Sequence, residues 1–426
     1  MEKAEEIDDR DLPPFKLLLA CPSGLSPSQV SVHFDESYDR IPHPDIDLEN
    51  SISEIWDQRV QLSTSLFNGK KFRSLESFHM SGVTGVGKTL KMKDDDAEGY
   101  GRGLLPLCSA SCPIFGLQYG GHVFHGVVDP NQGSHVCLHL GLTDYRSKMY
   151  TAIDVDSPFY VLHGGNFSLS FLLLRTFVGT NLSPLWDKFL AQSQDDCQQC
   201  QHTSSPLGNA AVVETSDKRI LVLQRSNMVG EFPDHFVFPG GHPEPEEVGT
   251  LSHQYDKDLT NSQLINRKVS QEMFDSIVRE VVEEIGVPAS SLCNPVFIGI
   301  SRRMLNVRPA AFFFIKCSLP SKEIQQLYSS AQDGYESTQL YTVPVVSLCT
   351  LSSMRCYCIV HVVLFWDKGD KDEALFEFLD SLAEYIAFSL LVFLFNEVES
   401  MASKMPGCHQ GGFALYKLMV EAAKDT

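Results

Sequence analysis

The segment from Arg279 to Val287, Arg-Glu-Val-Val-Glu-Glu-Ile-Gly-Val, constrains this chain more than any other part of its sequence. On an α-helix, Glu280 and Glu284 share one face, and Glu283 lies one turn from Glu280. Three carboxylates within one turn repel one another unless a cation lies among them, and such hard oxygen ligands suit Mg²⁺ or Mn²⁺. Gly286 follows where a helix end favours a residue that accepts the left-handed conformation. Taken alone, the segment fits a solvated, charged helix face equally well.

The residues upstream favour the metal-binding interpretation. Residues 232–247 contain a short apolar strand that leads into a Gly-Gly turn and then into acidic residues. Together the two segments resemble the Nudix box, the pattern G-x5-E-x7-R-E-U-x-E-E-x-G-U, in which U is aliphatic. Gly241 matches the glycine of that pattern, Glu247 matches its first glutamate, and residues 279–287 match its whole second half. The resemblance to Nudix hydrolases implies an α/β fold, the Nudix α/β/α sandwich, with an N-terminal α+β substrate-recognition region.

The box is split in this chain. The family pattern places its arginine eight positions after the first glutamate, whereas Arg279 lies 32 positions after Glu247. A polar insertion over about 248–268 accounts for the difference and leaves the acidic turn intact. We expect Ser270 to cap the helix, with Glu272 near its positive end. The expected buried stripe of this helix is Phe274, Ile277, Val278, Val281 and Ile285.

Four further strings narrow the resemblance to one subgroup of the family. They are Phe-Pro-Gly-Gly-His-Pro-Glu-Pro (238–245) and residues 140–146, 177–181 and 205–210. The subgroup contains plant enzymes and, more distantly, animal enzymes that cleave UDP-glucose and UDP-galactose. The resemblance implies hydrolysis of the pyrophosphate bond of a nucleoside diphosphate-linked small molecule, most simply a UDP-sugar that gives UMP and a sugar 1-phosphate. The implied cofactor is Mg²⁺, with Mn²⁺ as a substitute.

The resemblance also implies roles for the acidic turn. Glu280 and Glu284 would be metal ligands. Glu283 would be a third ligand or the base that takes a proton from the attacking water. Arg279 would orient the carboxylates through an ion pair, although a plain surface arginine is the alternative.

The substrate residues that the resemblance implies are Phe67, Tyr145, Arg225, His242 and Glu244. The two aromatic residues would contact a uracil, although an aromatic residue in an apolar run is more often part of a core. The arginine would pair with phosphate. The histidine and glutamate, in the loop after the Gly-Gly turn, would bind phosphate or sugar hydroxyls, and an ordinary loop position is the alternative for the histidine. Glu336 is a further candidate from a late loop.

The composition limits the partners and the setting. A net charge of −20 argues against binding to nucleic acid or to anionic membranes. Twelve cysteines without a disulfide framework, after an acidic start, predict a cytoplasmic protein with free thiols. Cys197 and Cys200, with His202 nearby, lack the second pair that a structural zinc site needs, and so predict an ordinary loop. The apolar run Tyr385–Phe395 is shorter than the roughly twenty residues that span a bilayer.

The sequence predicts an N-terminal region over 12–205 and a Nudix domain over 206–425. Within them we expect a helix around 52–62, a strand over 135–142, a hairpin over 209–224 and strands over 295–300 and 310–315. Three stretches, 74–118, 147–174 and 349–396, do not match the sequence on either side of them. We interpret them as translated non-coding sequence.

Three other functions remain as alternatives. Residues 82–89, Gly-Val-Thr-Gly-Val-Gly-Lys-Thr, satisfy the phosphate-binding P-loop pattern, with Lys88 as its lysine. A P-loop lies between a buried strand and a helix, and neither flank has the hydrophobic periodicity of those elements. A P-loop NTPase is therefore the weakest alternative. The two alternatives that rank above it are a Nudix-fold protein that binds a nucleotide sugar without cleaving it and a non-functional splice product. The oligomeric state remains open.

Overall fold

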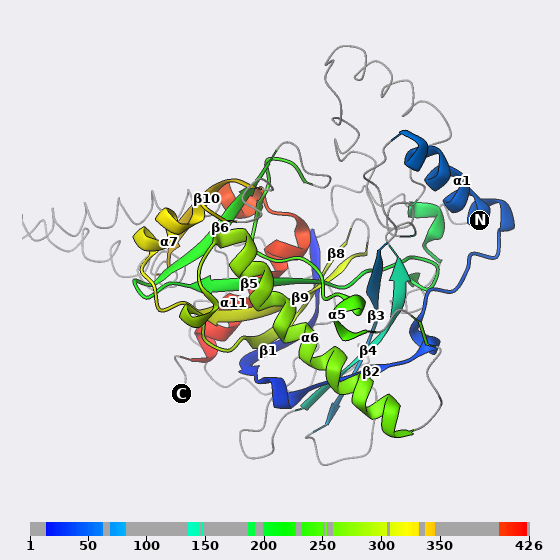
Figure 1. Ribbon diagram of the computed structural model, residues 1–426, viewed down its shortest axis with the longest axis horizontal. Helices are drawn as coiled ribbons and strands as arrows, with labels where there is room; N and C mark the ends of the chain where they lie inside the picture. The colour runs from blue at the N-terminus through cyan, green and yellow to red at the C-terminus, as the bar shows by residue number, and fades with distance from the viewer. Residues whose placement is uncertain are drawn as a thin grey trace, which may run out of the picture.

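The computed structural model shows two β-sheets joined side by side, with helices packed on them (Figure 1). It describes residues 14–62, 69–81, 135–144, 147, 186–191, 199–226, 232–249, 252–253, 259–304, 307–331, 337–345 and 400–423. One sheet has seven strands and the other has three. No helix among these residues is both long and apolar enough to cross a bilayer.

The seven-stranded sheet has the order β1-β8-β9-β5-β6-β10, and β7 pairs with β6. Its strands are β1 (Phe15–Leu25), β5 (Gly208–Glu214), β6 (Arg219–Arg225), β7 (Phe236–Val237), β8 (Val296–Arg303), β9 (Pro309–Lys316) and β10 (Ser337–Pro344). The central pair, β5 and β9, is parallel, and the other pairs are antiparallel. The hairpin predicted over 209–224 is confirmed by β5 and β6, and the two later predicted strands are confirmed by β8 and β9.

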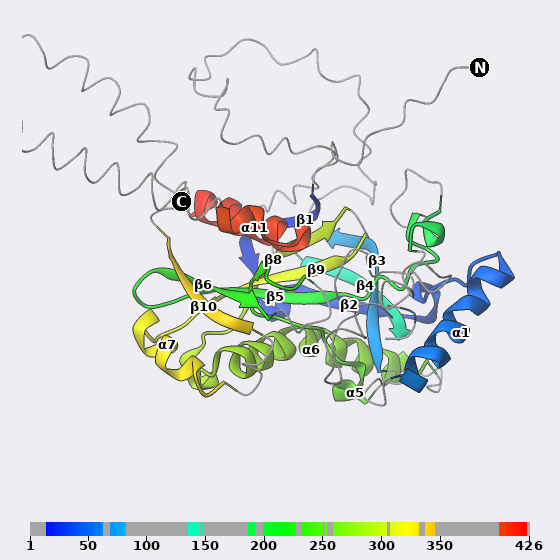
Figure 2. The same ribbon diagram turned by 90° about the horizontal axis from the view of Figure 1, so that it is seen from above.

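Two long helices cover the faces of this sheet. Helix α6 (Leu259–Ile285) lies on one face and α11 (Gly407–Ala422) on the other, so the fold has three layers (Figure 2). On β5, Ala211 and Val213 pack in the core beneath α6, whereas Ala210 and Val212 pack beneath α11. A strand that is buried on both faces has a continuous run of apolar residues in its sequence. The predicted α/β/α sandwich is confirmed.

Helix α6 carries the predicted buried stripe but begins earlier than expected. Phe274, Ile277, Val281 and Ile285 are in the core, and Val278 at the edge of the stripe is half-buried. The prediction that Ser270 caps the helix is wrong. The helix begins at Leu259, and the Ser270 hydroxyl donates to the Val30 carbonyl oxygen at 2.8 Å. Contacts with a neighbouring strand therefore extend the helix into the insertion.

The three-stranded sheet has the order β2-β4-β3. Strand β2 (Val30–Phe34) is parallel to β4 (His135–Asp144), which is antiparallel to β3 (Lys70–Ser81). The helix predicted around 52–62 lies within α1 (Ile46–Leu62), and the strand predicted over 135–142 lies within β4. Helix α6 packs on β2, and the Phe34 amide donates to the Asn266 side chain at 3.0 Å.

The shorter elements are η2 (Pro27–Gln29), η3 (Glu36–Tyr38), η5 (Trp186–Phe189), α5 (Pro245–Val248), η6 (Ala289–Ser291) and α7 (Ser321–Tyr328). Helices α5 and α7 lie on the same side of the large sheet as α6 (Figure 2).

A buried arginine holds the junction between the two sheets. Arg73, on β3, is 1% exposed. Its guanidinium donates to the carbonyl oxygens of Tyr38 and Cys200 at 2.8 Å and of Thr203 at 3.2 Å. Cys200 and His202 belong to the loop that carries two of these acceptors, whereas Cys197 lies outside the described residues, so the interpretation of all three as an ordinary loop stays a prediction.

The three stretches that differ from their flanks are mostly outside the described residues. Residues 74–81 continue β3 and pair with β4, and Ser147 is a described, buried residue. Residues 82–118, 148–174 and 349–396 lie outside the described part of the chain, so their interpretation as translated non-coding sequence stays a prediction. The domain boundary at 205/206 also stays a prediction; β1, from before it, pairs with β8, from after it.

Candidate active site

The C-terminal half of α6 packs against the turn formed by residues 240–242. The Gly240 amide donates to Glu284 Oε2 at 2.8 Å, and the His242 amide approaches Glu280 Oε1 at 3.4 Å. Glu284 is buried, with 8% of its surface exposed. Two of the predicted metal ligands thus face the predicted Gly-Gly turn, although they are about forty residues away in the chain.

The two glycines of this turn meet different neighbours. A Cβ atom on Gly240 would overlap the backbone carbonyl oxygen of Asn209, so close approach requires a glycine there, whereas one on Gly241 would overlap the carboxylate of Glu280 and displace it. The absence of a side chain therefore lets the backbone lie directly against the acidic helix. Gly286, with a φ of +82°, ends the helix in the left-handed conformation that the sequence predicted.

A buried asparagine, missed by the sequence analysis, joins the turn to the helix. Asn209 is 3% exposed. Its Oδ1 accepts from the Gly241 amide at 3.0 Å, and its Nδ2 donates to Ser276 Oγ at 2.7 Å. Its own amide donates to the Gly241 carbonyl oxygen at 3.0 Å. The signal in the sequence that could have identified Asn209 was a single polar residue at the start of an otherwise apolar strand.

Arg279 pairs with Glu272 of its own helix. Its Nη2 lies 2.7 Å from Glu272 Oε1, which also accepts from the Glu244 amide at 3.0 Å. Burial lowers the pKa of Arg279, but the hydrogen bond and charge of Glu272, with the charges of Glu247 and Glu280, raise it overall. The sequence placed Glu272 at a helix start; the structure places it in the helix interior as a buried carboxylate, 6% exposed, that holds the arginine.

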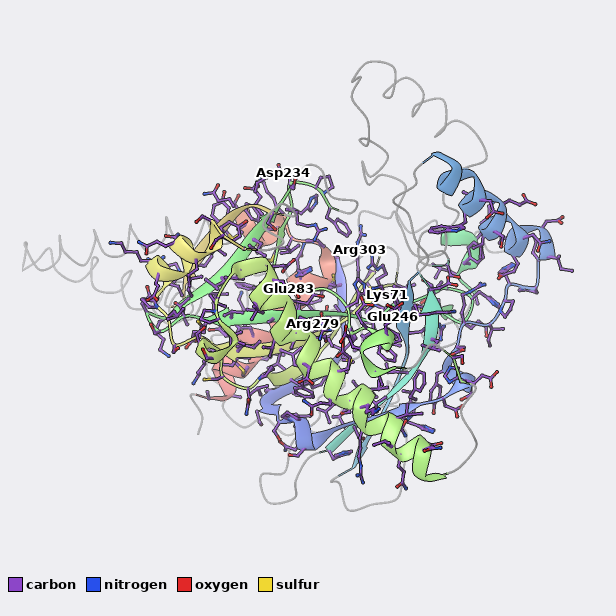
Figure 3. All side chains as sticks on the ribbon, viewed as in Figure 1. Lys71, Asp234, Glu246, Arg279, Glu283 and Arg303 are labelled. Carbon is purple, nitrogen blue, oxygen red and sulfur yellow. The ribbon has the colours of Figure 1, made fainter. Side chains whose placement is uncertain are left out.

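A lysine from the three-stranded sheet reaches the loop of this site. Lys71 Nζ, on β3, forms an ion pair with the carboxylate of Glu244. The backbone amide of Glu244 is bound to Glu272, so the loop is fixed from both sides. Figure 3 shows Lys71, Glu246, Arg279 and Glu283 together in the central part of the molecule. The sequence analysis missed Lys71 because no local pattern relates β3 to this loop.

Positive charge gathers at the sheet end where β6 finishes. Arg225 is the last residue of β6, and its amide donates to the His235 carbonyl oxygen at 2.9 Å. His409, on α11, accepts from the Phe238 amide at 3.1 Å, two residues before Gly240. Desolvation, together with the charges of Arg225 and Arg308, lowers the pKa of His409 to about 3. A neutral histidine therefore braces the strand that leads into the turn.

The remaining predicted residues are placed as follows. Glu283 is half-buried on α6, and Glu247 is exposed on α5. Phe67, Tyr145, Glu336 and the P-loop-like residues 82–89 lie outside the described residues, so their roles stay predictions.

The donor atoms of the acidic turn suit a hard divalent cation, since they are carboxylate oxygens from Glu280, Glu283 and Glu284. Burial of Glu284 beside Glu280 adds to the benefit of a positive charge there. Within the described part of the chain, no three Asp, Glu, His or Cys side chains converge closely enough to enclose an ion by themselves. The geometry of the site thus places an acidic helix directly against a Gly-Gly turn.

Comparison with known proteins identifies the family. The chain is 45% identical to Nudix hydrolase 9 of Arabidopsis thaliana over 417 residues, which are 97% of this chain and 93% of that protein. It is 26% identical to uridine diphosphate glucose pyrophosphatase NUDT22 of Homo sapiens, over 78% of this chain and 83% of that protein. The chain belongs to the Nudix hydrolase family, whose members generally use divalent metal cations.

Among solved structures, the chain is similar to the MutT protein of Methanosarcina mazei Go1, with 15% identity and a TM-score of 0.21. That match covers 33% of this chain and 76% of the other. No family model matches the chain.

Proposed function

We propose that this protein hydrolyses the pyrophosphate bond of a UDP-sugar and releases UMP and a sugar 1-phosphate. The observation that carries the proposal is the packing of Glu280 and Glu284 against the turn at residues 240–242. The human and mouse relatives named uridine diphosphate glucose pyrophosphatases, 26% and 28% identical, support the choice of substrate.

In this proposal Glu280 and Glu284 would hold Mg²⁺, for which Mn²⁺ can substitute, and Glu283 would be the base. Such an ion, when bound, supplies positive charge that offsets the pyrophosphate and lowers the pKa of a nearby water. Carboxylate ligands need fixed positions for this purpose, and the Gly240 amide and the Asn209–Ser276 bond provide them.

The chain's own residues then transfer one proton. Glu283 would take a proton from the attacking water while the oxygen of that water forms a bond to phosphorus. The bond between that phosphorus and the bridging oxygen breaks, and the two phosphate products separate. Arg279 fixes the helix through Glu272 and does not touch the reacting atoms.

The substrate contacts in this proposal come from several elements. Arg225 would pair with a phosphate oxygen, and His242 would bind phosphate or a sugar hydroxyl from the loop after the turn. Glu244 would bind a sugar hydroxyl with the oxygen that its ion pair with Lys71 leaves available. Phe67 and Tyr145 would contact the uracil.

Product analysis tests the proposal. Purified protein is incubated with UDP-glucose, UDP-galactose, ADP-ribose or NADH, in Mg²⁺ or in a chelator. We expect UMP and sugar 1-phosphate from the two UDP-sugars, only when the metal is present. UDP with free sugar would show cleavage of the wrong bond, and soluble protein that yields nothing from any compound would reject hydrolysis in favour of binding alone.

A further inference from the structure

Strand β3 of the three-stranded sheet is fixed relative to the Gly-Gly turn by backbone hydrogen bonds. The Phe72 carbonyl oxygen accepts from the Leu207 amide at 2.9 Å. Two residues further along the chain, the Asn209 amide donates to the Gly241 carbonyl oxygen at 3.0 Å. Helix α5, which follows the turn, also packs on β3. A side chain that points from β3 toward the turn therefore starts from a fixed backbone.

Lys71, next to Phe72 on this strand, holds Glu244 of the loop after the turn. Its Nζ pairs with Oε1 of the Glu244 carboxylate, and the two side chains are 16% and 36% exposed. Glu244 lies at the N-terminal cap of α5, yet its carboxylate makes no capping hydrogen bond with that helix. Its amide donates to Glu272 at 3.0 Å. The backbone of Glu244 is thus held by α6 and its side chain by β3.

The charges around Glu244 make the lysine necessary for this arrangement. The Glu272 carboxylate lies against its backbone, and two further glutamates follow in the first turn of α5. The cation that α6 contributes here, Arg279, is already paired with Glu272. Like charges repel more strongly where water is partly excluded. Without the charge of Lys71, the Glu244 carboxylate would turn away from its acidic neighbours toward solvent.

We propose that Lys71 is a positioning residue for sugar recognition, because it directs the Glu244 carboxylate toward the sugar of the substrate. The inference rests on the proposed function, in which Glu244 accepts from a sugar hydroxyl. Oε2 of that carboxylate has no hydrogen bond with any described residue, so it stays open to such a donor. Lys71 acts through Glu244 and not on the reacting atoms. Recognition of the sugar then depends on the three-stranded sheet, whereas the chemistry depends on α6.

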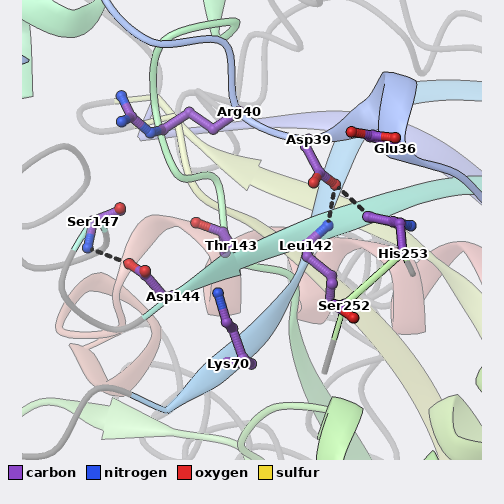
Figure 4. A pocket seen from close by; sticks show the side chains of 10 residues that line it. All are labelled: Glu36, Asp39, Arg40, Lys70, Leu142, Thr143, Asp144, Ser147, Ser252 and His253. Carbon is purple, nitrogen blue, oxygen red and sulfur yellow. Dashed lines mark hydrogen bonds and ion pairs between the residues drawn. The ribbon is translucent and has the colours of Figure 1, made fainter. Parts of the chain in front are cut away.

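The adjacent lysine gives a matched control. Successive side chains of a β-strand point to opposite faces of the sheet. Lys70 accordingly lines a polar pocket on the other side of β3, together with Asp144 and Ser252 (Figure 4). Loss of this second lysine removes one positive charge from the same strand and leaves the ion pair with Glu244 in place.

Isothermal titration calorimetry tests this proposal on Glu283→Gln protein in Mg²⁺, so that the ligands stay intact. Lys71→Met, Lys71→Arg and Lys70→Met are each added to this parent, and the ligands are UDP-glucose and UDP. We expect Lys71→Met to weaken UDP-glucose binding about tenfold, the loss of a hydrogen bond to a charged group. The Kd of UDP, which lacks the sugar, should stay within about twofold of the parent value. Lys71→Arg keeps the charge and should keep the Kd of UDP-glucose within about threefold, and Lys70→Met should leave it unchanged.

A double variant shows whether Lys71 acts through Glu244. Adding Lys71→Met to Glu244→Gln should cause no further loss of affinity, because both changes remove the same ion pair. If circular dichroism shows that Lys71→Met does not fold, Glu244→Gln alone gives the same comparison of the two ligands.

The proposal is overturned if Lys71→Met leaves the Kd of UDP-glucose within about twofold of the parent value, or if UDP loses as much affinity. It is also overturned if Lys70→Met causes the same loss, if the double variant binds more weakly than Glu244→Gln, or if the parent binds no UDP-glucose. Normal binding by the parent, without products from the wild-type protein, would reject the proposed hydrolysis, and the role of Lys71 would then stand or fall on the Kd values.

Discussion

The two sheets of this protein hold buried polar side chains through different kinds of partner. Beside the seven-stranded sheet, the partners are side chains of the acidic helix: Asn209 bonds to Ser276, and Glu272 bonds to Arg279. On the three-stranded sheet, Arg73 donates to the backbone carbonyl oxygens of Tyr38, Cys200 and Thr203. Side-chain partners on one helix fix the positions that a reaction needs, whereas carbonyl partners from separate segments join those segments together. The comparison assigns chemistry to the first region and assembly of the fold to the second.

The largest effect is expected from Glu284→Gln. A glutamine keeps an acceptor for the Gly240 amide but loses the charge that would hold the metal. A loss of several kcal/mol of transition-state stabilisation lowers kcat on the order of a thousandfold. Steady-state kinetics in saturating Mg²⁺ measure the loss. A circular dichroism spectrum equal to that of the wild type is the check that the fold survives.

Gly241→Ala is expected to lower kcat about a hundredfold, because the new methyl group would displace the Glu280 carboxylate. Gly249→Ala is the control. Gly249, unlike Gly241, has a left-handed backbone, with a φ of +75°, but no atom lies within 4 Å of its Cβ position. The control should lose about 1 kcal/mol of stability and keep its kcat. Equal losses of kcat in both variants would mean that the turn does not depend on close approach.

Asn209→Ala removes the link between the turn and α6. The Gly241 amide loses its acceptor in a buried place, so the free energy of unfolding should fall by about 1–3 kcal/mol. Urea denaturation measures the change, with Thr143→Val beside it. The buried Thr143 hydroxyl has no hydrogen-bond partner to lose, so equal destabilisation by the two substitutions would contradict the role assigned to the Asn209 hydrogen bonds.

His409 gives the smallest expected effect, visible in the pH dependence of stability. Its folded pKa of about 3 lies below the ordinary value of 6.5, so the unfolded chain takes up the proton first as the pH falls. Its stabilising contribution is complete well above pH 6.5, and about 2 kcal/mol of it is lost by pH 5. His409→Asn, which can keep an acceptor for the Phe238 amide, should remove this loss. Urea titrations at pH 7 and pH 5 compare the two proteins, and equal pH dependence would contradict the assignment.

The sequence predicted those features that depend on residues close together in the chain or on a known family pattern. The apolar stripe of α6, the Gly-Gly turn and the left-handed Gly286 follow from spacing and residue type. The helix start did not follow, because packing against β2 overrides the local preference of Ser270 for a cap. Asn209, Lys71 and His409 were missed because their partners lie far away in the sequence, where no periodicity relates them.

The central claim is that the glutamate turn performs the reaction. The direct test is to measure kcat and KM for UDP-glucose with Glu284→Gln beside the wild-type protein in saturating Mg²⁺. The account predicts a kcat reduced on the order of a thousandfold in the variant. A Glu284→Gln variant that keeps its fold and its kcat would contradict the account.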